Sequence, residues 1–293
     1  MKKGIIVKGI GGFYYISYEN NIYECKARGK FRNKKITPLV GDYVLFTFDE
    51  NINQGVIDHI LDRDVELVRP PIANVEQAII VFALKNPDPN FTLLDKILIM
   101  SEYHNLELKI CINKIDLNDD KLLKEISEIY ETAGYEVIPC STKENIGIKR
   151  IKEILKDKIS VFAGPSGVGK SSILNQVQSG LELKTGEISS KIKRGKHTTR
   201  HSELLQLACG GWVADSPGFT SLSIDYIDAE ELGYLFPEFK PFLENCKFSN
   251  CFHINEPDCG VKKGLEEGYI KQNRYNNYVY FLEQIQETRN RRY

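Results

Sequence analysis

The sequence lacks any long apolar run, and its net charge is close to zero. No stretch approaches the roughly 18 consecutive apolar residues of a membrane-spanning helix, so we expect no membrane association. Lys2 and Lys3 are followed by only three apolar residues before Lys8, too few for the core of a signal peptide. The formal net charge of −1 argues against a uniformly basic nucleic-acid-binding chain. Any basic surface must therefore be local.

The chain also lacks the even number of cysteines that is typical of a disulfide framework. It has seven cysteines in 293 residues, and three of them lie near one histidine. This arrangement indicates reduced thiols and a metal site, and it favours a cytoplasmic protein. With 42% hydrophobic and 27% charged residues, the chain has room for two or three domains.

A glycine-rich stretch in the middle of the chain follows an apolar run and precedes a helical pattern. Residues 159–163 predict a buried strand, and the pattern GxxxxGK[ST] follows it directly. In this context the backbone N–H groups of the loop surround a di- or triphosphate. Lys170 would add a positive charge, and the Ser171 hydroxyl would bind Mg²⁺. The predicted phosphate loop consists of Gly164, Pro165, Ser166, Gly167, Val168, Gly169, Lys170, Ser171 and Ser172.

Two further motifs at predicted strand ends indicate a guanine-nucleotide site. Residues 113–116 read NKID. Asp116 can accept hydrogen bonds from N1–H and the N2 amine of guanine, while Asn113 supports the base and Lys114 lies along its face. Asp215 and Gly218 of the sequence DSPG would supply a magnesium ligand and an N–H for the γ-phosphate. Residues predicted to support the base are Ser141, Thr142 and Lys143.

The order of these motifs is unusual. Ordinary GTPases carry the phosphate loop before the base-reading motif, whereas here the NKID motif comes first. The chain is therefore predicted to be circularly permuted. Over nearly its whole length it resembles one family, the circularly permuted small-ribosomal-subunit biogenesis GTPases. The motifs predict GTP and GDP as ligands. The resemblance implies the small ribosomal subunit and its rRNA as partner, late in subunit maturation, with hydrolysis stimulated by that partner. We expect a monomer.

The predicted fold is multidomain. Residues 1–68 form an N-terminal oligonucleotide-binding (OB) fold β-barrel, residues 69–226 a central circularly permuted P-loop GTPase α/β domain, and residues 227–293 a zinc-binding, mostly helical C-terminal domain. Two prolines in the Arg-Pro-Pro of residues 69–71 mark the first boundary, because proline disrupts both helices and strand pairing. From residue 78 strands and helices alternate, which predicts a parallel sheet. The five barrel strands are predicted at 4–8, 13–18, 22–27, 43–48 and 55–60.

A basic stretch separates the third and fourth predicted strands. Residues 26–35 contain six basic residues and no acidic one. A solvated loop is the ordinary interpretation of such a run. Its place on a probable barrel, with Phe31 available for stacking, instead favours RNA contact. The RGK and VGD sequences at residues 28–30 and 40–42 resemble those of the family's barrel. Predicted RNA-binding residues are Arg28, Lys30, Arg32, Lys34 and Lys35.

Glutamine is absent where many GTPases use it to orient the attacking water, because Phe219 follows the DSPG motif. Either another group orients the water or hydrolysis waits for a partner. His197 is the nearest candidate, although a lone histidine can equally be structural. A threonine in the preceding segment would complete the magnesium shell, and the resemblance favours Thr199 over Thr198. The predicted catalytic residues are Lys170, His197 and Thr199, and the predicted magnesium ligands are Ser171, Thr199 and Asp215.

Three cysteines and one histidine near the C-terminus have the spacing of a metal site. Cys246, Cys251, His253 and Cys259 would form a closed tetrahedral Zn²⁺ site, which is structural rather than catalytic. Free buried thiols are the alternative. Two other functions remain open: an RNA-binding scaffold that GTP only stabilises, and a translation or tRNA factor with the same chemistry.

Overall fold

The computed structural model describes residues 1–33, 36–68, 71–178, 202–215 and 223–290. The chain forms two compact units, each assembled from separate stretches of sequence. The first comprises Met1–Ala78, Ile148–Ser166 and Lys170–Thr220, and the second comprises Ile79–Gly147, Gly167–Gly169 and Ser221–Tyr293. These units divide the predicted central domain between them. The predicted boundaries after residues 68 and 226 therefore stay predictions.

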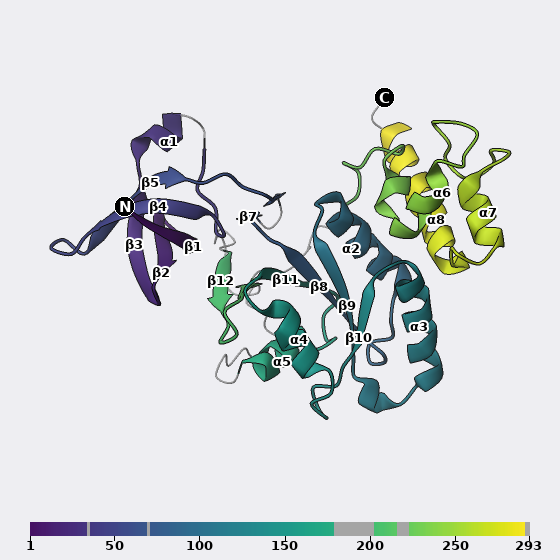
Figure 1. Cartoon of the computed structure of the whole chain (residues 1–293), viewed down its shortest axis with the longest axis horizontal. Coiled ribbons are helices and arrows are strands. Elements are labelled where there is room, and N and C mark those ends of the chain that lie inside the picture. The colour runs from purple at the N-terminus through teal and green to yellow at the C-terminus, as the bar shows by residue number, and fades with distance from the viewer. Residues whose placement is uncertain (34–35, 69–70, 179–201, 216–222, 291–293) are drawn as a thin grey trace. The chain divides into compact units, whose positions relative to one another are not determined.

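A small β-barrel occupies the N-terminal part of the first unit (Figure 1). Its strands are β1 (Lys2–Ile10), β2 (Phe13–Tyr18), β3 (Asn21–Ala27), β4 (Tyr43–Asp49) and β5 (Gln54–Ile60). β1 pairs with β2 and β4, β2 with β3, β3 with β5, and β5 with β4, so the ring of pairings closes. Ile6, Ile16, Phe46 and Ile57 fill its interior and are fully buried. The predicted barrel is confirmed; β2 has its predicted bounds and the other strands are slightly longer.

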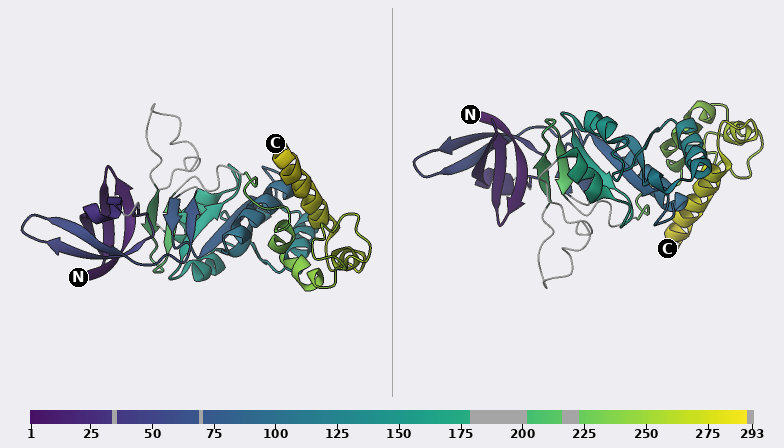
Figure 2. Two further views of the ribbon diagram at one scale, coloured as in Figure 1. Left: turned by 90° about the horizontal axis from the view of Figure 1, so that it is seen from above. Right: turned by 90° about the horizontal axis from the view of Figure 1, so that it is seen from below.

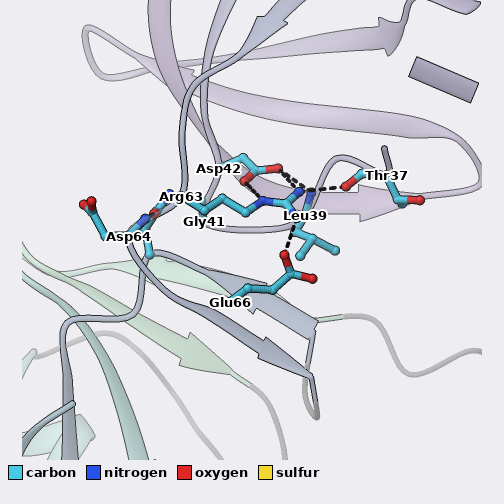
Figure 3. A network of polar contacts seen from close by, with 8 residues as sticks. Thr37, Leu39, Gly41, Asp42, Arg63, Asp64 and Glu66 are labelled. Carbon is cyan, nitrogen blue, oxygen red and sulfur yellow. Dashed lines mark hydrogen bonds and ion pairs between the residues drawn. The ribbon is translucent and has the colours of Figure 1, made fainter. Parts of the chain in front are cut away.

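A polar network holds the barrel to the linker that follows it (Figure 3). The Arg63 guanidinium donates to both carboxylate oxygens of Asp42, at 2.7 and 2.8 Å, and to the carbonyl oxygen of Thr37 at 2.8 Å. It also donates to Glu66 at 2.6 Å. Asp42 is completely buried and accepts a further hydrogen bond from the backbone N–H of Leu39 at 2.7 Å. This network joins the loop before β4 to the chain after β5.

The linker forms a hairpin of β6 (Glu66–Val68) and β7 (Pro71–Ala73). Pro71 pairs with Val68, so this proline does not end strand pairing as expected. The first residue of a strand tolerates proline, which explains the difference. Gly41 packs against this hairpin with φ of 92°, and a Cβ there would lie 2.0 Å from the carbonyl oxygen of Ala73. Only glycine fits that contact.

The first unit continues with strands that precede and follow the phosphate loop. They are β11 (Ile159–Ala163), β12 (Glu203–Gln206) and β13 (Trp212–Asp215), accompanied by α4 (Ile148–Leu155) and α5 (Lys170–Val177). β11 and β13 are parallel, as predicted, and β12 is antiparallel to β13. β12 also pairs with the barrel strand β1, where Lys8 and Glu203 form an ion pair of 2.9 Å. The barrel is therefore hydrogen-bonded directly to the strand that follows residues 179–201.

The second unit contains the other part of the nucleotide-binding fold. Its strands lie in the order β10 (Glu136–Pro139), β9 (Glu107–Asn113) and β8 (Gln77–Ala83), with helices α2 (Phe91–Tyr103) and α3 (Asp120–Thr132). Every residue of β8 is buried, and β9 and β10 are parallel. Asn90 and Asp119 cap α2 and α3 through their side chains. The predicted alternation of strands and helices is confirmed.

The C-terminal residues of the second unit are mostly helical. They form η3 (Leu232–Leu235), η4 (Pro237–Phe239), α6 (Lys240–Leu243), α7 (Gly260–Glu266) and α8 (Gln272–Asn290). These green and yellow elements stay together in both views of Figure 2. Phe236, Phe239, Tyr278 and Phe281 form their buried aromatic core. Among the residues described above, no helix is long and apolar enough to span a bilayer.

Candidate nucleotide-binding site and metal centre

The phosphate loop follows a strand whose five residues are all buried. Gly164, Gly167 and Gly169 have φ values of 131°, 80° and 101°, which bend the chain back toward α5. A Cβ on Gly169 would lie 2.2 Å from Nδ2 of Asn113, so no side chain fits there. The predicted strand, loop and helix are thus confirmed. Val168 is fully buried, Ser171 is 8% exposed near the start of α5, and Ser166 is exposed.

Lys170 folds back over the loop that it follows. Its Nζ donates to the carbonyl oxygens of Gly164 and Pro165, at 2.8 and 2.6 Å. Burial lowers the pKa of Lys170 to about 8. A phosphate group beside the ammonium would favour its charged form, so nucleotide binding and protonation of Lys170 are linked.

The base-reading motif is bonded to the phosphate loop within the second unit. Asn113, the last residue of β9, donates from Nδ2 to the carbonyl oxygen of Val168 at 2.8 Å. Lys114 has φ of 63° and donates to the carbonyl oxygen of Gly167 at 2.8 Å. The structure thereby brings the motif at residues 113–116 against a loop about fifty residues later.

Asp116 lies in the short helix η1 (Ile115–Leu117). Its Oδ1 accepts a hydrogen bond of 2.7 Å from the hydroxyl of Ser141, which is fully buried. That bond fixes the orientation of the Asp116 carboxylate. Thr142 is half-buried and Lys143 is exposed.

Several predicted site residues cannot be compared with the structure. His197, Thr199, Gly218 and Phe219 lie outside the described residues. Asp215 ends β13, but its side chain is also outside the description. The magnesium and catalytic assignments for these residues stay predictions.

Sequence reasoning missed Asn86, which contacts the base-reading motif. The carbonyl oxygen of Asn86 accepts from Lys114, and a Cβ added to Gly167 would lie 3.9 Å from Cδ of Pro87. The thiol of Cys140 lies 3.3 Å from Oδ1 of Asn113. Asn86 could have been suspected, because it follows a buried strand and ligands lie at the carboxyl ends of parallel strands. Cys140 opens the stretch at residues 140–143 that the sequence predicts to support the base.

The four predicted metal ligands converge in the second unit. The ligand atoms of Cys246, Cys251, His253 and Cys259 all lie within 4.8 Å of one another. His253 Nδ1 is 3.5 Å from Sγ of Cys246 and 3.4 Å from Sγ of Cys259, and those two sulfurs are 3.9 Å apart. Bonds of about 2.3 Å to sulfur and 2.0 Å to nitrogen at tetrahedral angles give edges of about 3.8 and 3.5 Å. The three printed distances match these edges, and with Cys251 inside 4.8 Å the four groups could hold one metal ion.

The backbone around this cluster is held by neighbouring side chains. Glu256 accepts from the backbone N–H groups of Phe252 and Ile254, at 2.7 and 2.9 Å. Hydroxyl groups on α8 bond to the same turn: Tyr275 donates to the carbonyl oxygen of His253 at 2.7 Å, and Tyr278 to that of Phe252 at 3.0 Å. These contacts orient the histidine and attach the cluster to α8.

The basic stretch after β3 differs from its prediction. It contains a short helix, α1 (Gly29–Asn33). Phe31 is only 6% exposed, so the expectation that it stacks on RNA is wrong: its ring belongs to the barrel core. Arg28 is half-exposed, and its Nε donates to the buried carboxylate of Asp58 at 2.7 Å. Lys30 lies over the Phe31 ring. The side chain of Arg32, and all of Lys34 and Lys35, lie outside the description.

Comparisons with known proteins agree with this geometry. The model for the RsgA GTPase family matches residues 60–225, and the model for the RsgA N-terminal domain matches residues 3–57. The small ribosomal subunit biogenesis GTPase RsgA of Alkaliphilus metalliredigens is 50% identical over 294 residues, covering 100% of both chains. The protein of that name from Clostridium botulinum is 50% identical over 293 residues, covering 99% of this chain and 100% of its own.

Two solved structures have the same fold. YjeQ from Thermotoga maritima has a TM-score of 0.86 at 39% identity, covering 97% of this chain and 98% of that one. YloQ, described as a circularly permuted GTPase, has a TM-score of 0.83 at 40% identity, covering 98% of this chain and 96% of that one. The predicted permutation of a GTPase fold is thereby confirmed.

Proposed function

Because the chain belongs to the RsgA GTPase family, we propose that it hydrolyses GTP to GDP and phosphate on the small ribosomal subunit and assists the late maturation of that subunit. The observation that carries this proposal is the bonding of Asn113 and Lys114 to carbonyl oxygens of the phosphate loop. It joins guanine recognition and phosphate binding in one site. The printed name of the relatives supports the choice of partner.

Each element of the site has a role in the proposed reaction. Lys170 and the N–H groups at the start of α5 would bind the β- and γ-phosphates. Mg²⁺ accompanies GTP in this chemistry, and we assign Ser171, Thr199 and Asp215 to its shell. Gly218 would donate its N–H to the γ-phosphate. His197 would orient the attacking water, because Phe219 carries no polar group for that task.

Zinc is the metal that we assign to Cys246, Cys251, His253 and Cys259. Three thiolates and one imidazole are typical zinc ligands, and the spacing of the donor atoms leaves no open position for catalysis. The metal would stabilise a segment of short turns and helices.

RNA contact is assigned to the basic stretch on the barrel: Arg28, Lys30, Arg32, Lys34 and Lys35. Each phosphate contact releases counterions, so binding to the subunit should weaken with salt by a slope of about −0.7 per contact on single strands. Neutralising Lys30, Arg32, Lys34 and Lys35 together should flatten that slope. Arg28 is left intact in this variant, because removing it would also strip Asp58 of its ion pair. We further propose a cytoplasmic monomer.

One assay separates this function from its alternatives. GTP hydrolysis is measured for the protein alone, with small subunits, with large subunits and with tRNA. Stimulation by small subunits alone supports the proposal. Stimulation by tRNA would favour a tRNA or translation factor, and absence of turnover under every condition would favour a scaffold.

The same assay tests His197. Replacing it with alanine should preserve GTP and subunit affinity but remove most of the stimulated turnover, since only the transition state is affected. Near-normal stimulated hydrolysis in the variant would place the water-orienting group elsewhere, most simply in the ribosome.

A further inference from the structure

A groove with a volume of about 690 Å³ lies on the C-terminal elements of the second unit, between residues 242 and 267. It is lined by α6, by α7 and by the turn at residues 256–259, and the two helices lie against each other (Figure 1). Glycines bring α7 close to Phe242. A Cβ on Gly260 would lie 2.2 Å from the carbonyl oxygen of Phe242, and a Cβ on Gly264 would lie 3.0 Å from its ring. The groove is therefore built by tight packing beneath it.

Acidic side chains outnumber basic ones in this groove. It is lined by four acidic and two basic residues: Glu256, Asp258, Glu266, Glu267, Lys262 and Lys263. The two lysines are already engaged, because Lys263 lies 3.8 Å from Glu267 and Lys262 donates to the carbonyl oxygen of Glu256 at 3.4 Å. Asp258 pairs with Lys247 at 3.2 Å. Within the described ranges Glu266 has no ion pair, so the groove keeps an excess of negative charge.

Apolar surface lies among these charges. Phe242 and Pro257 line the groove, and the exposed Tyr269 ring lies 5.9 Å from that of Phe242. Lysine and arginine side chains match such a surface, since their aliphatic stems cover apolar groups while the charged head reaches a carboxylate. A cation beside an aromatic ring gains further attraction. RNA phosphates would instead meet carboxylates of the same sign, which disfavours RNA as the occupant.

We propose that this groove binds a basic segment of a protein, rich in lysine or arginine, and that on the small ribosomal subunit it contacts a protein component. The proposal rests on the proposed function, which names that subunit as the partner. It gives the groove beside the metal cluster a role in recognition that is separate from holding the metal.

Charge reversal separates protein from RNA by the sign of its effect. In the double variant Glu266→Lys, Glu267→Lys, affinity for purified small subunits should fall about five- to tenfold, because two attractive positions become repulsive. A groove that faced RNA would bind more tightly in this variant. Both residues are exposed and distant from the phosphate loop in sequence, so basal GTP hydrolysis should be unchanged. Unchanged or increased affinity for the subunit would overturn the proposal.

The matched control carries the same change in charge elsewhere in the second unit. Glu230 and Glu231 are also exposed neighbours, and they do not line the groove. The double variant Glu230→Lys, Glu231→Lys should therefore keep wild-type affinity for small subunits. An equal loss in this control would show that the effect arises from net charge, and the groove would lose its assigned role.

Photocrosslinking identifies the occupant. The photoreactive residue p-benzoylphenylalanine replaces Lys263, which leaves every carboxylate of the groove in place, and the GTP-bound protein is irradiated on small subunits. The expected adduct is with a protein and is removed by protease but not by ribonuclease. An adduct with rRNA alone, or none, would overturn the proposal. A wild type that does not bind small subunits would instead overturn the proposed function.

Discussion

Arg63 and Arg274 each attach a peripheral segment through two carboxylates, but one attachment is open to water and the other is sealed. The Arg63 side chain is 19% exposed; it binds the buried Asp42 and the exposed Glu66. The Arg274 side chain is 1% exposed, and it binds Asp95 of α2 at 2.7 Å and Glu238 of η4 at 2.6 Å, both buried. The barrel linker is therefore held by a partly hydrated pair, and α8 by a buried charge network.

Aromatic rings and further side-chain hydrogen bonds surround the buried network. Phe236 lies 4.6 Å from the Arg274 guanidinium, and the Tyr130 hydroxyl donates to Asp95 at 2.9 Å. Asn277, one turn along α8 from Arg274, donates to the other oxygen of Asp95 at 2.5 Å. Buried charged groups need several polar partners. When one partner is removed, the remaining ion is left buried without a substitute for water. The comparison indicates that substitutions in the buried network of Arg274 should destabilise the fold strongly. Substitutions in the partly exposed network of Arg63 should have smaller effects.

Metal removal should produce the largest difference between the two regions. Structural zinc contributes an apparent free energy of about 10–16 kcal/mol in small zinc-binding peptides, so chelation should unfold the turns around residues 246–259. Hydrogen exchange should rise there and remain unchanged in the barrel, and added zinc should reverse the change. Cys246→Ser should likewise lose stoichiometric metal. If the reduced wild type contained no zinc by elemental analysis, the assignment of the metal would be wrong.

Arg274→Met should have the next largest effect. It leaves Asp95 and Glu238 buried without their cation, which costs about 3–5 kcal/mol of the free energy of unfolding. Denaturant titration measures this loss. The triple variant Arg274→Met, Asp95→Asn, Glu238→Gln carries no buried charge and should recover part of it. A single variant as stable as the wild type would contradict the importance of the sealed network.

Arg63→Met should cost less, about 1–3 kcal/mol. Water can reach the position of its guanidinium, and Asp42 would keep its hydrogen bond from the Leu39 N–H. Denaturant titration of this variant gives a loss of unfolding free energy that can be compared directly with the loss in Arg274→Met. A loss at Arg63 equal to that at Arg274 would show that exposure does not separate the two attachments.

The smallest effect concerns Lys170, which belongs to neither attachment. Its pKa of about 8 means that the free site is charged below pH 8 and progressively neutral above it. Bound phosphates raise that pKa, so GTP affinity should be constant below pH 8 and should fall by up to about tenfold per pH unit above it. Lys170→Arg, which stays charged, should remove this dependence. Calorimetric titration with GTP between pH 6.5 and 9.5 measures the affinity of the wild type and of Lys170→Arg. A wild-type affinity independent of pH would contradict the lowered pKa of Lys170.

The sequence by itself determined the local elements and the sites that motifs define. The barrel strands, the alternation after residue 78, the phosphate loop and the four metal ligands could be predicted, because residue periodicity and short spacings act within one stretch of chain. The cluster of three cysteines and one histidine could be predicted for the same reason, since these residues lie within fourteen positions.

Only the tertiary structure decided the contacts between distant residues. Arg274 meets Asp95 across 179 positions of sequence, and Asn113 meets Val168 across 55. Phe31 was expected to be available for RNA because its neighbours are basic, yet the folded chain buries it. Such pairings depend on which faces pack together, and no local pattern of residue types encodes that choice.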